Sequence, residues 1–135
     1  MLDNFKDKTI VITGGSGYIG TSLIKELKGQ AKRVICVSRK KITKHRDIEV
    51  WELDLQKRSS WKQIFKESDV IFHLGGNTSV YHAEQNPEES LISTLYPIMH
   101  MINAARELSL VPRIIFASTA TVYGLTDALP VSELT

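Results

Sequence analysis

The sequence has few of the residues that mark several large protein classes. One cysteine, Cys36, stands among 135 residues, so a disulfide framework and a cysteine-based zinc site are both excluded. No apolar run approaches the roughly 18 residues of a membrane-spanning helix, and residues 1–8 carry too many charges for a signal peptide. We therefore expect a cytoplasmic protein without membrane contacts.

An excess of charge of one sign is also missing. Lysine and arginine number 17 and aspartate and glutamate 15, a formal net charge of +2, which is too small to predict a nucleic-acid partner. No two histidines stand at the spacing of metal ligands, so we expect no metal site. The 42% of hydrophobic residues is sufficient for an ordinary core, and we interpret residues 1–135 as one domain.

Strand-like and helix-like segments alternate along the chain. Short apolar or β-branched runs predict strands at 9–13, 33–37, 48–53, 69–74 and 113–117. Helical spacing of apolar residues predicts helices from about 19 to Gly29, from 59 to 66 and from 87 to 110. This rhythm predicts an α/β fold with a parallel sheet covered by helices.

Two of the predicted helices carry specific expectations. Ser59 or Ser60 is the expected cap of the second helix. In the third, Pro97 predicts a kink or a break. Its expected core face holds the apolar residues Leu91, Leu95, Ile98, Ile102 and Ala105.

The segment 13–20, Thr-Gly-Gly-Ser-Gly-Tyr-Ile-Gly, is the strongest chemical signal. It holds four of the eight glycines, directly after a predicted strand and at the start of a predicted helix, which is the context that a dinucleotide fingerprint requires. Glycine permits the tight turn and lets a pyrophosphate approach the backbone N–H groups at the positive end of the helix dipole. The last glycine allows close approach of helix and strand. The segment therefore predicts a nucleotide-binding turn.

Further segments match a known family in order. The fingerprint Gly14-x-x-Gly17-x-x-Gly20 after Thr13 resembles that of the extended short-chain dehydrogenases/reductases, the NAD(P)-dependent sugar-nucleotide epimerases and dehydratases. The later segments that resemble this family are Asp54-Leu55, His73-Leu74-Gly75-Gly76, Ala104-Ala105-Arg106 and 116–124. The resemblance covers nearly the whole chain.

The resemblance implies a Rossmann-type doubly wound sheet of order 3-2-1-4-5 in three α/β/α layers, with the cofactor at the carboxyl ends of the strands. It implies that this chain is the N-terminal, cofactor-binding part of a longer enzyme whose C-terminal substrate domain is absent here. The cofactor-binding residues that it implies, together with those at the end of the second strand, are Gly14, Gly17, Tyr18, Ile19, Gly20, Ser38, Arg39, Asp54, Leu55, Leu74, Gly75, Gly76 and Ala117.

The end of the second strand bears on the choice of cofactor. An acidic residue about twenty positions after the glycine turn would bind the ribose 2′-OH of NAD. Ser38 stands eighteen residues after Gly20 and is followed by Arg39, Lys40 and Lys41. An arginine can bind a 2′-phosphate through its planar fork of donors. We therefore expect NADP to be favoured over NAD, with a solvated basic loop as the alternative.

The resemblance also implies a reaction, hydride transfer on a nucleotide sugar that leads to epimerisation, dehydration or reduction. Thr119 would bind the reacting oxygen as the catalytic hydroxyl. The family's Tyr-x-x-x-Lys pair has no counterpart in these 135 residues, because the positions four after the tyrosines are Ser22, Gln85, His100 and Asp127. We expect no turnover from these residues alone, and a non-catalytic NADP(H)-binding module or an inactive fragment are the alternatives.

Other positions have structural interpretations beside the functional ones. Asp54 is also a typical start of a turn, and His73 is expected to be a hydrogen-bonded core histidine. Cys36 reads as a small buried apolar residue. Many members of the family form a homodimer through the helix that here contains Pro97, so a homodimer is a further expectation.

Overall fold

The computed structural model describes residues 5–39, 48–77, 79–127 and 129–134. Its elements follow one another as β1 (Thr9–Thr13), α1 (Tyr18–Leu27), β2 (Arg33–Ser38), β3 (Glu49–Glu52), α2 (Arg58–Glu67), β4 (Val70–His73), α3 (Val80–Gln85), α4 (Pro87–Leu108), β5 (Arg113–Phe116) and the 3₁₀ helix η1 (Ala120–Tyr123). The five predicted strands are all present, at bounds within two residues of the expectation.

The strands form one parallel sheet of order β3-β2-β1-β4-β5, as predicted. Thr13 at the end of β1 pairs with Val37 on one side and with His73 at the end of β4 on the other. The chain proceeds from β1 to one side through β2 and β3, and returns to the other side of β1 through β4. The strand order therefore reverses between β1 and β4, which is where open α/β sheets bind ligands.

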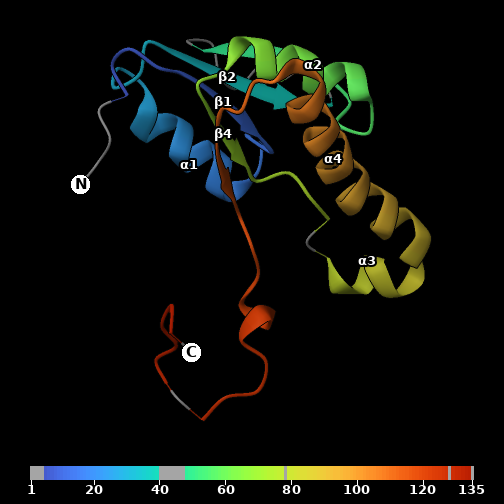
Figure 1. Cartoon of the computed structure of the whole chain (residues 1–135). Helices are drawn as coiled ribbons and strands as arrows, with labels where there is room; N and C mark the ends of the chain where they lie inside the picture. Colours follow the sequence, from blue (N-terminus) through green and yellow to red (C-terminus); the bar gives the residue numbers. More distant parts are fainter. Residues whose placement is uncertain (1–4, 40–47, 78, 128, 135) are drawn as a thin grey trace.

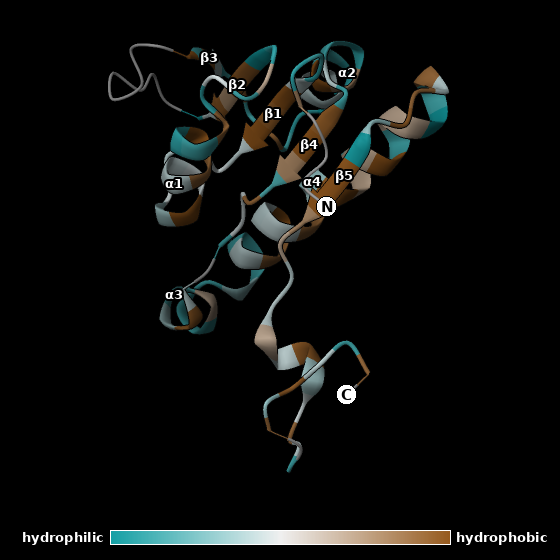
Figure 2. Cartoon of the chain, turned by 90° about the vertical axis from the view of Figure 1, so that its left-hand side faces the viewer, coloured by the Kyte–Doolittle hydropathy of each residue, from teal (hydrophilic) through white to brown (hydrophobic). Residues whose placement is uncertain are grey.

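Successive residues of the strands point to opposite faces of the sheet, and both faces are apolar. Val11, Ile35 and Ile71 pack on one face against residues of α2 and α4. Ile10, Cys36 and their neighbours pack on the other face against α1. Figures 1 and 2 show these helices on either side of the hydrophobic strands, and the fold has the expected three layers.

The sequence did not reveal α3, and two expectations for α4 were wrong in part. The helix α4 continues from Pro87 to Leu108, so of the predicted kink or break at Pro97 the break does not occur. Its buried residues are Pro97, Met101 and Ala104, because that face meets α2 and the sheet. Within the expected core face, Ile98 and Ala105 contact the core, whereas Leu91, Leu95 and Ile102 are exposed.

The expected cap of α2 was wrong as well. The helix begins at Arg58, its cap residue is Lys57, and no side chain caps it. Ser60 instead lies inside the first turn and is buried. The turn that starts at Asp54 leads into the helix, since the Lys57 amide donates to the Asp54 carbonyl at 3.1 Å, and this places the helix start two residues earlier than Ser60.

The described residues include no helix that is both long enough and apolar enough to cross a membrane.

Candidate dinucleotide site

The glycine turn lies against the loop that follows β4. Gly14 has a φ of +69°, a conformation that side chains disfavour. A Cβ atom on Gly14 would stand 2.8 Å from the backbone of Leu74 and Gly75. The sequence expectation assigned the glycines to the approach of a pyrophosphate. At Gly14, however, the structure shows that the neighbour is a second loop of the protein.

The last glycine of the fingerprint lies where α1 crosses its own turn. A Cβ on Gly20 would stand 2.5 Å from the Gly14 carbonyl oxygen and 2.6 Å from the Gly15 Cα. The close approach is therefore between the helix and the turn before it rather than between the helix and a strand. Tyr18 and Ile19 occupy the first turn of α1 and are exposed, and the N–H groups of that turn have no acceptor within the helix.

The ends of β1 and β4 are joined by a buried hydrogen-bonded link. The Thr13 Oγ1 atom lies 2.7 Å from His73 Nδ1 and accepts the Gly75 N–H at 3.3 Å. Leu74 N–H donates to the Thr13 carbonyl at 3.2 Å. His73 is therefore a hydrogen-bonded core histidine, as predicted. The role of Thr13 was not predicted from the sequence. The available signal was the position of Thr13 directly before the glycines.

Burial also sets the protonation of this link. His73 is 2% exposed, and its ring centroid lies 5.3 Å from that of Trp61 and 5.5 Å from that of Phe116. Burial among these aromatic rings lowers the pKa of His73 below its ordinary value. Burial thus favours the neutral form of the imidazole.

The other half of the sheet brings the ends of β2 and β3 to the same edge. Ser38 and Asp54 are partly buried, and Arg39 is exposed. The Leu53 N–H donates to the Ser38 carbonyl at 3.0 Å, and the Asp54 carboxylate accepts the Gln56 N–H at 3.0 Å. Asp54 therefore does start a turn. The basic residues Lys40, Lys41, Lys44 and Arg46 lie outside the described residues.

Leu55 extends this edge toward the loop after β4. A Cβ on Gly75 would stand 3.4 Å from Leu55 Cδ1 and 3.3 Å from Thr13 Oγ1, whereas a Cβ on Gly76 would meet nothing within 4 Å. The structure thus brings the glycine turn, Leu55 and the Leu74–Gly76 loop together at the point where the strand order reverses.

Most of the chain that follows β5 lies away from the sheet (Figure 1). The Ala117 N–H donates to the His73 carbonyl at 3.2 Å, which keeps Ala117 beside the end of β4. Thr119 is exposed and precedes η1, and its hydroxyl accepts the Thr121 N–H at 3.3 Å. Figure 1 shows the chain leaving the sheet after β5, with η1 apart from the layers. The Thr119 hydroxyl also lies 3.0 Å from Thr121 Oγ1, so its hydrogen-bond partners among the described residues belong to its own turn rather than to the rest of the predicted site.

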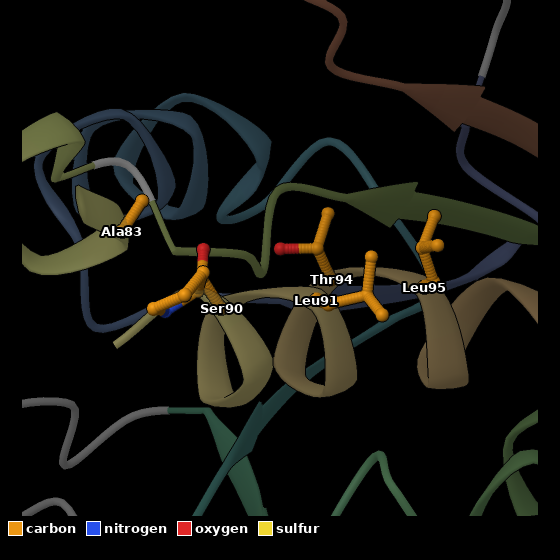
Figure 3. A pocket seen from close by; sticks show the side chains of 6 residues that line it. Ala83, Ser90, Leu91, Thr94 and Leu95 are labelled. Carbon is orange, nitrogen blue, oxygen red and sulfur yellow. The ribbon is translucent and has the colours of Figure 1, made fainter. Parts of the chain in front are cut away.

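A hollow of about 360 Å³ lies between α3 and α4 and is lined by Ala83, Pro87, Ser90, Leu91, Thr94 and Leu95. The side chains of Ser90, Thr94 and Leu95 rise from the same side of α4 (Figure 3). Asn77, the residue directly after the Leu74–Gly76 loop, donates from Nδ2 to Ser90 Oγ at 3.4 Å, and this Nδ2 atom lies 2.9 Å from His82 Nδ1. The hollow is therefore connected to the end of β4.

Across the described ranges, no group of three or more His, Cys, Asp or Glu residues could hold a metal ion. Cys36, whose Sγ would stand 2.5 Å from a Cβ on Gly15, is fully buried. Desolvation raises the pKa of its thiol, so the thiol packs as a small apolar group, as predicted.

These features together fit a dinucleotide. A positive-φ glycine turn opens onto the start of a helix, and a second glycine loop lies against it at the strand-order reversal. The site offers backbone N–H groups for a pyrophosphate and a carboxylate, Asp54, beside the apolar Leu55 at the end of β3. The fold and site therefore define a doubly wound dinucleotide-binding α/β protein.

Comparison with known proteins identifies the family to which this dinucleotide-binding chain belongs. Residues 10–135 match the NAD dependent epimerase/dehydratase family, and the chain belongs to that family. UDP-glucose 4-epimerase of Haemophilus influenzae is 28% identical over 138 residues, which span 92% of this chain and 40% of that protein. UDP-glucuronic acid decarboxylase 1 of Xenopus tropicalis is 28% identical over 130 residues, 93% of this chain and 30% of that protein.

Solved structures agree with the observed architecture. Epimerase Mth375 from Methanothermobacter thermautotrophicus matches with a TM-score of 0.79 and 27% identity, over 96% of this chain and 41% of that one. A UDP-glucose-4-epimerase from Stenotrophomonas maltophila with bound NAD matches with a TM-score of 0.81 over 93% of this chain and 41% of that one. Its identity is 24%, so that likeness shows the fold. The chain spans 30–40% of the length of the two curated relatives named above.

Proposed function

We propose that residues 1–135 form the nicotinamide-dinucleotide-binding domain of an enzyme that transfers hydride to and from a nucleotide sugar. The observation that carries this proposal is the contact between the Gly14 turn and the Leu74–Gly75 loop at the strand-order reversal. The Haemophilus and Xenopus relatives are named for UDP-sugar chemistry, which supports a nucleotide sugar as the substrate class of the whole enzyme.

The chain's own residues have separate tasks in this proposal. The turn that ends at Gly17 and the first turn of α1 bind the pyrophosphate through backbone N–H groups. Asp54, Leu55 and the Leu74–Gly76 loop line the adenosine half and the middle of the cofactor, with Ala117 at the end of β5. The nicotinamide, when bound, supplies hydride transfer, and Thr119 would hydrogen-bond the reacting sugar oxygen.

The proposed cofactor is NADP(H) rather than NAD(H). Neither Ser38 nor Arg39 carries a negative charge at the end of β2, where an acidic residue would repel a 2′-phosphate. The exposed Arg39 follows Ser38 directly and can form charge-assisted hydrogen bonds to that phosphate.

A fluorescence titration of the 135-residue chain with NADPH and with NADH tests this preference. We expect NADPH to bind about tenfold more tightly, and Arg39→Ala to remove that difference, because a charge-assisted hydrogen bond contributes about 1.5–3 kcal/mol. Lys66→Ala, at the far end of α2, removes an equal charge elsewhere and serves as the matched control. Equal affinities in the parent chain would contradict the NADP preference, and absence of binding to either nucleotide would contradict the proposed function.

The enzyme is further proposed to be a homodimer that uses the exposed apolar side of α4. Leu91, Leu95, Met99 and Ile102 recur at helical spacing on that side and are each 45–56% exposed. A continuous apolar stripe of this kind is typical of a contact between helices.

A further inference from the structure

The ends of β1 and β4 are separated by 60 residues in the sequence and are joined by more than the sheet. The backbone of Thr13 accepts from Leu74 N–H, and its side chain contacts His73 and Gly75. The link therefore runs from the residue before the glycine turn to all three residues 73–75 of the second loop.

The hydrogen atoms of this link can be assigned by counting donors and acceptors. A threonine hydroxyl donates once and accepts twice. Within the described part of the chain, Thr13 Oγ1 has two hydrogen-bond partners, His73 Nδ1 at 2.7 Å and Gly75 N at 3.3 Å. The amide is a donor, and the proton of a buried hydroxyl also needs an acceptor, which of these two partners only Nδ1 can be. His73 is then the acceptor and carries its own proton on Nε2.

The burial of both side chains keeps water from replacing the hydrogen bond between Thr13 and His73. Thr13 is 0% exposed. His73 is 2% exposed, and its ring contacts the rings of Trp61 and Phe116. A hydroxyl or amide that loses its partner in such a place pays a desolvation penalty, because water cannot replace the partner. The acceptor at residue 73 binds the Thr13 hydroxyl proton, so the lone pairs of the Thr13 oxygen face the Gly75 N–H. The orientation of the Gly75 amide consequently depends on residue 73.

The same link controls the distance between the two glycine loops. The Gly14 Cα lies so close to Leu74 and Gly75 that a Cβ atom would be 2.8 Å from their backbone atoms. A shift of Gly75 moves the surface on which the Gly14 turn rests, and with it the N–H groups at the start of α1.

We infer that Thr13 and His73 are positioning residues of the cofactor site: the Thr13 hydroxyl, oriented by His73, holds the Gly75 loop and the Gly14 turn in the spacing that binds the dinucleotide. This inference rests on the proposed function. Both side chains are buried, so the pair acts on the cofactor site through the two backbones rather than by direct contact.

Two pairs of substitutions in the 135-residue chain test this assignment. Thr13→Val removes the hydroxyl and keeps the shape, while Thr13→Ser keeps the hydroxyl. His73→Leu removes the acceptor, while His73→Asn retains an acceptor near the position of Nδ1. Three quantities are measured for each: the Kd for NADPH and NADH by nicotinamide fluorescence, the amide exchange rate of Gly75 without nucleotide, and the thermal midpoint.

We expect Thr13→Val and His73→Leu each to weaken nucleotide binding about tenfold and to speed Gly75 exchange, with Thr13→Ser and His73→Asn within about threefold of the parent. The double variant Thr13→Val/His73→Leu should bind about as weakly as either single variant, since both break one link.

Two results would overturn the inference. One is a Thr13→Val protein with a lowered thermal midpoint and an unchanged Kd, which is the mark of a structural role only. The other is a Thr13→Ser protein as impaired as Thr13→Val. Should Thr13→Val fail to fold, the contrast between His73→Leu and His73→Asn makes the same decision. A parent chain that binds neither nucleotide contradicts the proposed function instead, so the two failures are distinguishable.

Discussion

At the scale of single residues, the glycines of the turn are required by the lack of space around them as well as by their conformational freedom. Gly14 meets the backbone of Leu74 and Gly75, Gly15 meets the Cys36 side chain, and Gly20 meets the turn that precedes it. Each of these positions lacks room for a methyl group. The turn is consequently packed on three sides before any nucleotide binds.

Gly20→Ala is the cleanest test of this packing, because Gly20 is buried and helical. The added methyl would overlap the Gly14 carbonyl oxygen at 2.5 Å. We expect the free energy of unfolding to fall by about 1–3 kcal/mol, the usual cost of overpacking, as measured by urea denaturation. Gly76→Ala is the matched control, since a Cβ there meets nothing within 4 Å. Equal stability of the two variants would contradict the close approach at Gly20.

At the scale of the elements, Arg33 joins β2, β3 and α2 at the edge opposite the site. Its Nε and Nη2 atoms donate to both oxygens of Glu49 at 2.7 and 2.8 Å, and Nη1 donates to Glu67 at 2.8 Å. Trp51 donates to Glu49 at 2.6 Å, and the guanidinium lies 5.7 Å from the Trp51 ring centroid. This network secures β3, a four-residue edge strand.

The network predicts a pH-dependent contribution to stability. The hydrogen bonds from Arg33 and Trp51 lower the pKa of Glu49 below its ordinary value of 4.5. A lowered carboxyl pKa stabilises the folded state above the unfolded pKa, and this contribution is lost as the pH falls through the folded pKa. Because the pair is partly exposed, we expect Glu49→Gln to cost only about 0.5–1 kcal/mol at pH 7.

The same difference should vanish below the lowered pKa of Glu49, where the parent carboxyl is protonated as well. Urea denaturation of parent and variant across the acidic range measures it. Glu52→Gln, at an exposed position of the same strand, is the control and should show no such dependence. A Glu49→Gln effect that stays constant down to the lowest pH would contradict the assignment.

At the scale of the whole molecule, α4 has two apolar sides, of which one is buried and the other is exposed. One side, with Pro97, Met101 and Ala104, is buried against α2 and the sheet. The other, with Leu91, Leu95, Met99 and Ile102, is exposed. A helix of 22 residues with apolar residues over so wide an arc has more such surface than one core can cover.

The proposed dimer makes a prediction about this second side. Ile102→Glu should shift the protein toward the monomer, because it places a charge in an apolar helix contact. Sedimentation velocity over a range of protein concentrations measures the shift. Gln63→Glu, which adds the same charge to an exposed position of α2, should leave the distribution unchanged. A parent chain that is monomeric at every concentration would contradict the dimer.

Much of the fold follows from local patterns. β-Branched runs such as Thr9–Thr13 predict buried strands, and the glycines directly after that strand predict the tight turn before α1. Both signals lie within a few neighbouring residues, where backbone sterics and the period of apolar residues act. The nucleotide class of the ligand follows from the same local signals, because the glycines stand between a strand and a helix. The order of the strands was instead implied by the family resemblance that several such segments carry together.

Other features depend on residues far apart in the chain. The link between Thr13 and His73, the contact of Gly14 with Leu74, and the choice of the Pro97–Met101–Ala104 side of α4 as the core face arise only when β1, β4 and α2 are packed together. Periodicity marks both sides of α4 as apolar, and it contains no information on which side meets the sheet. That choice is made by the space between α2 and the strands, which long-range packing alone creates.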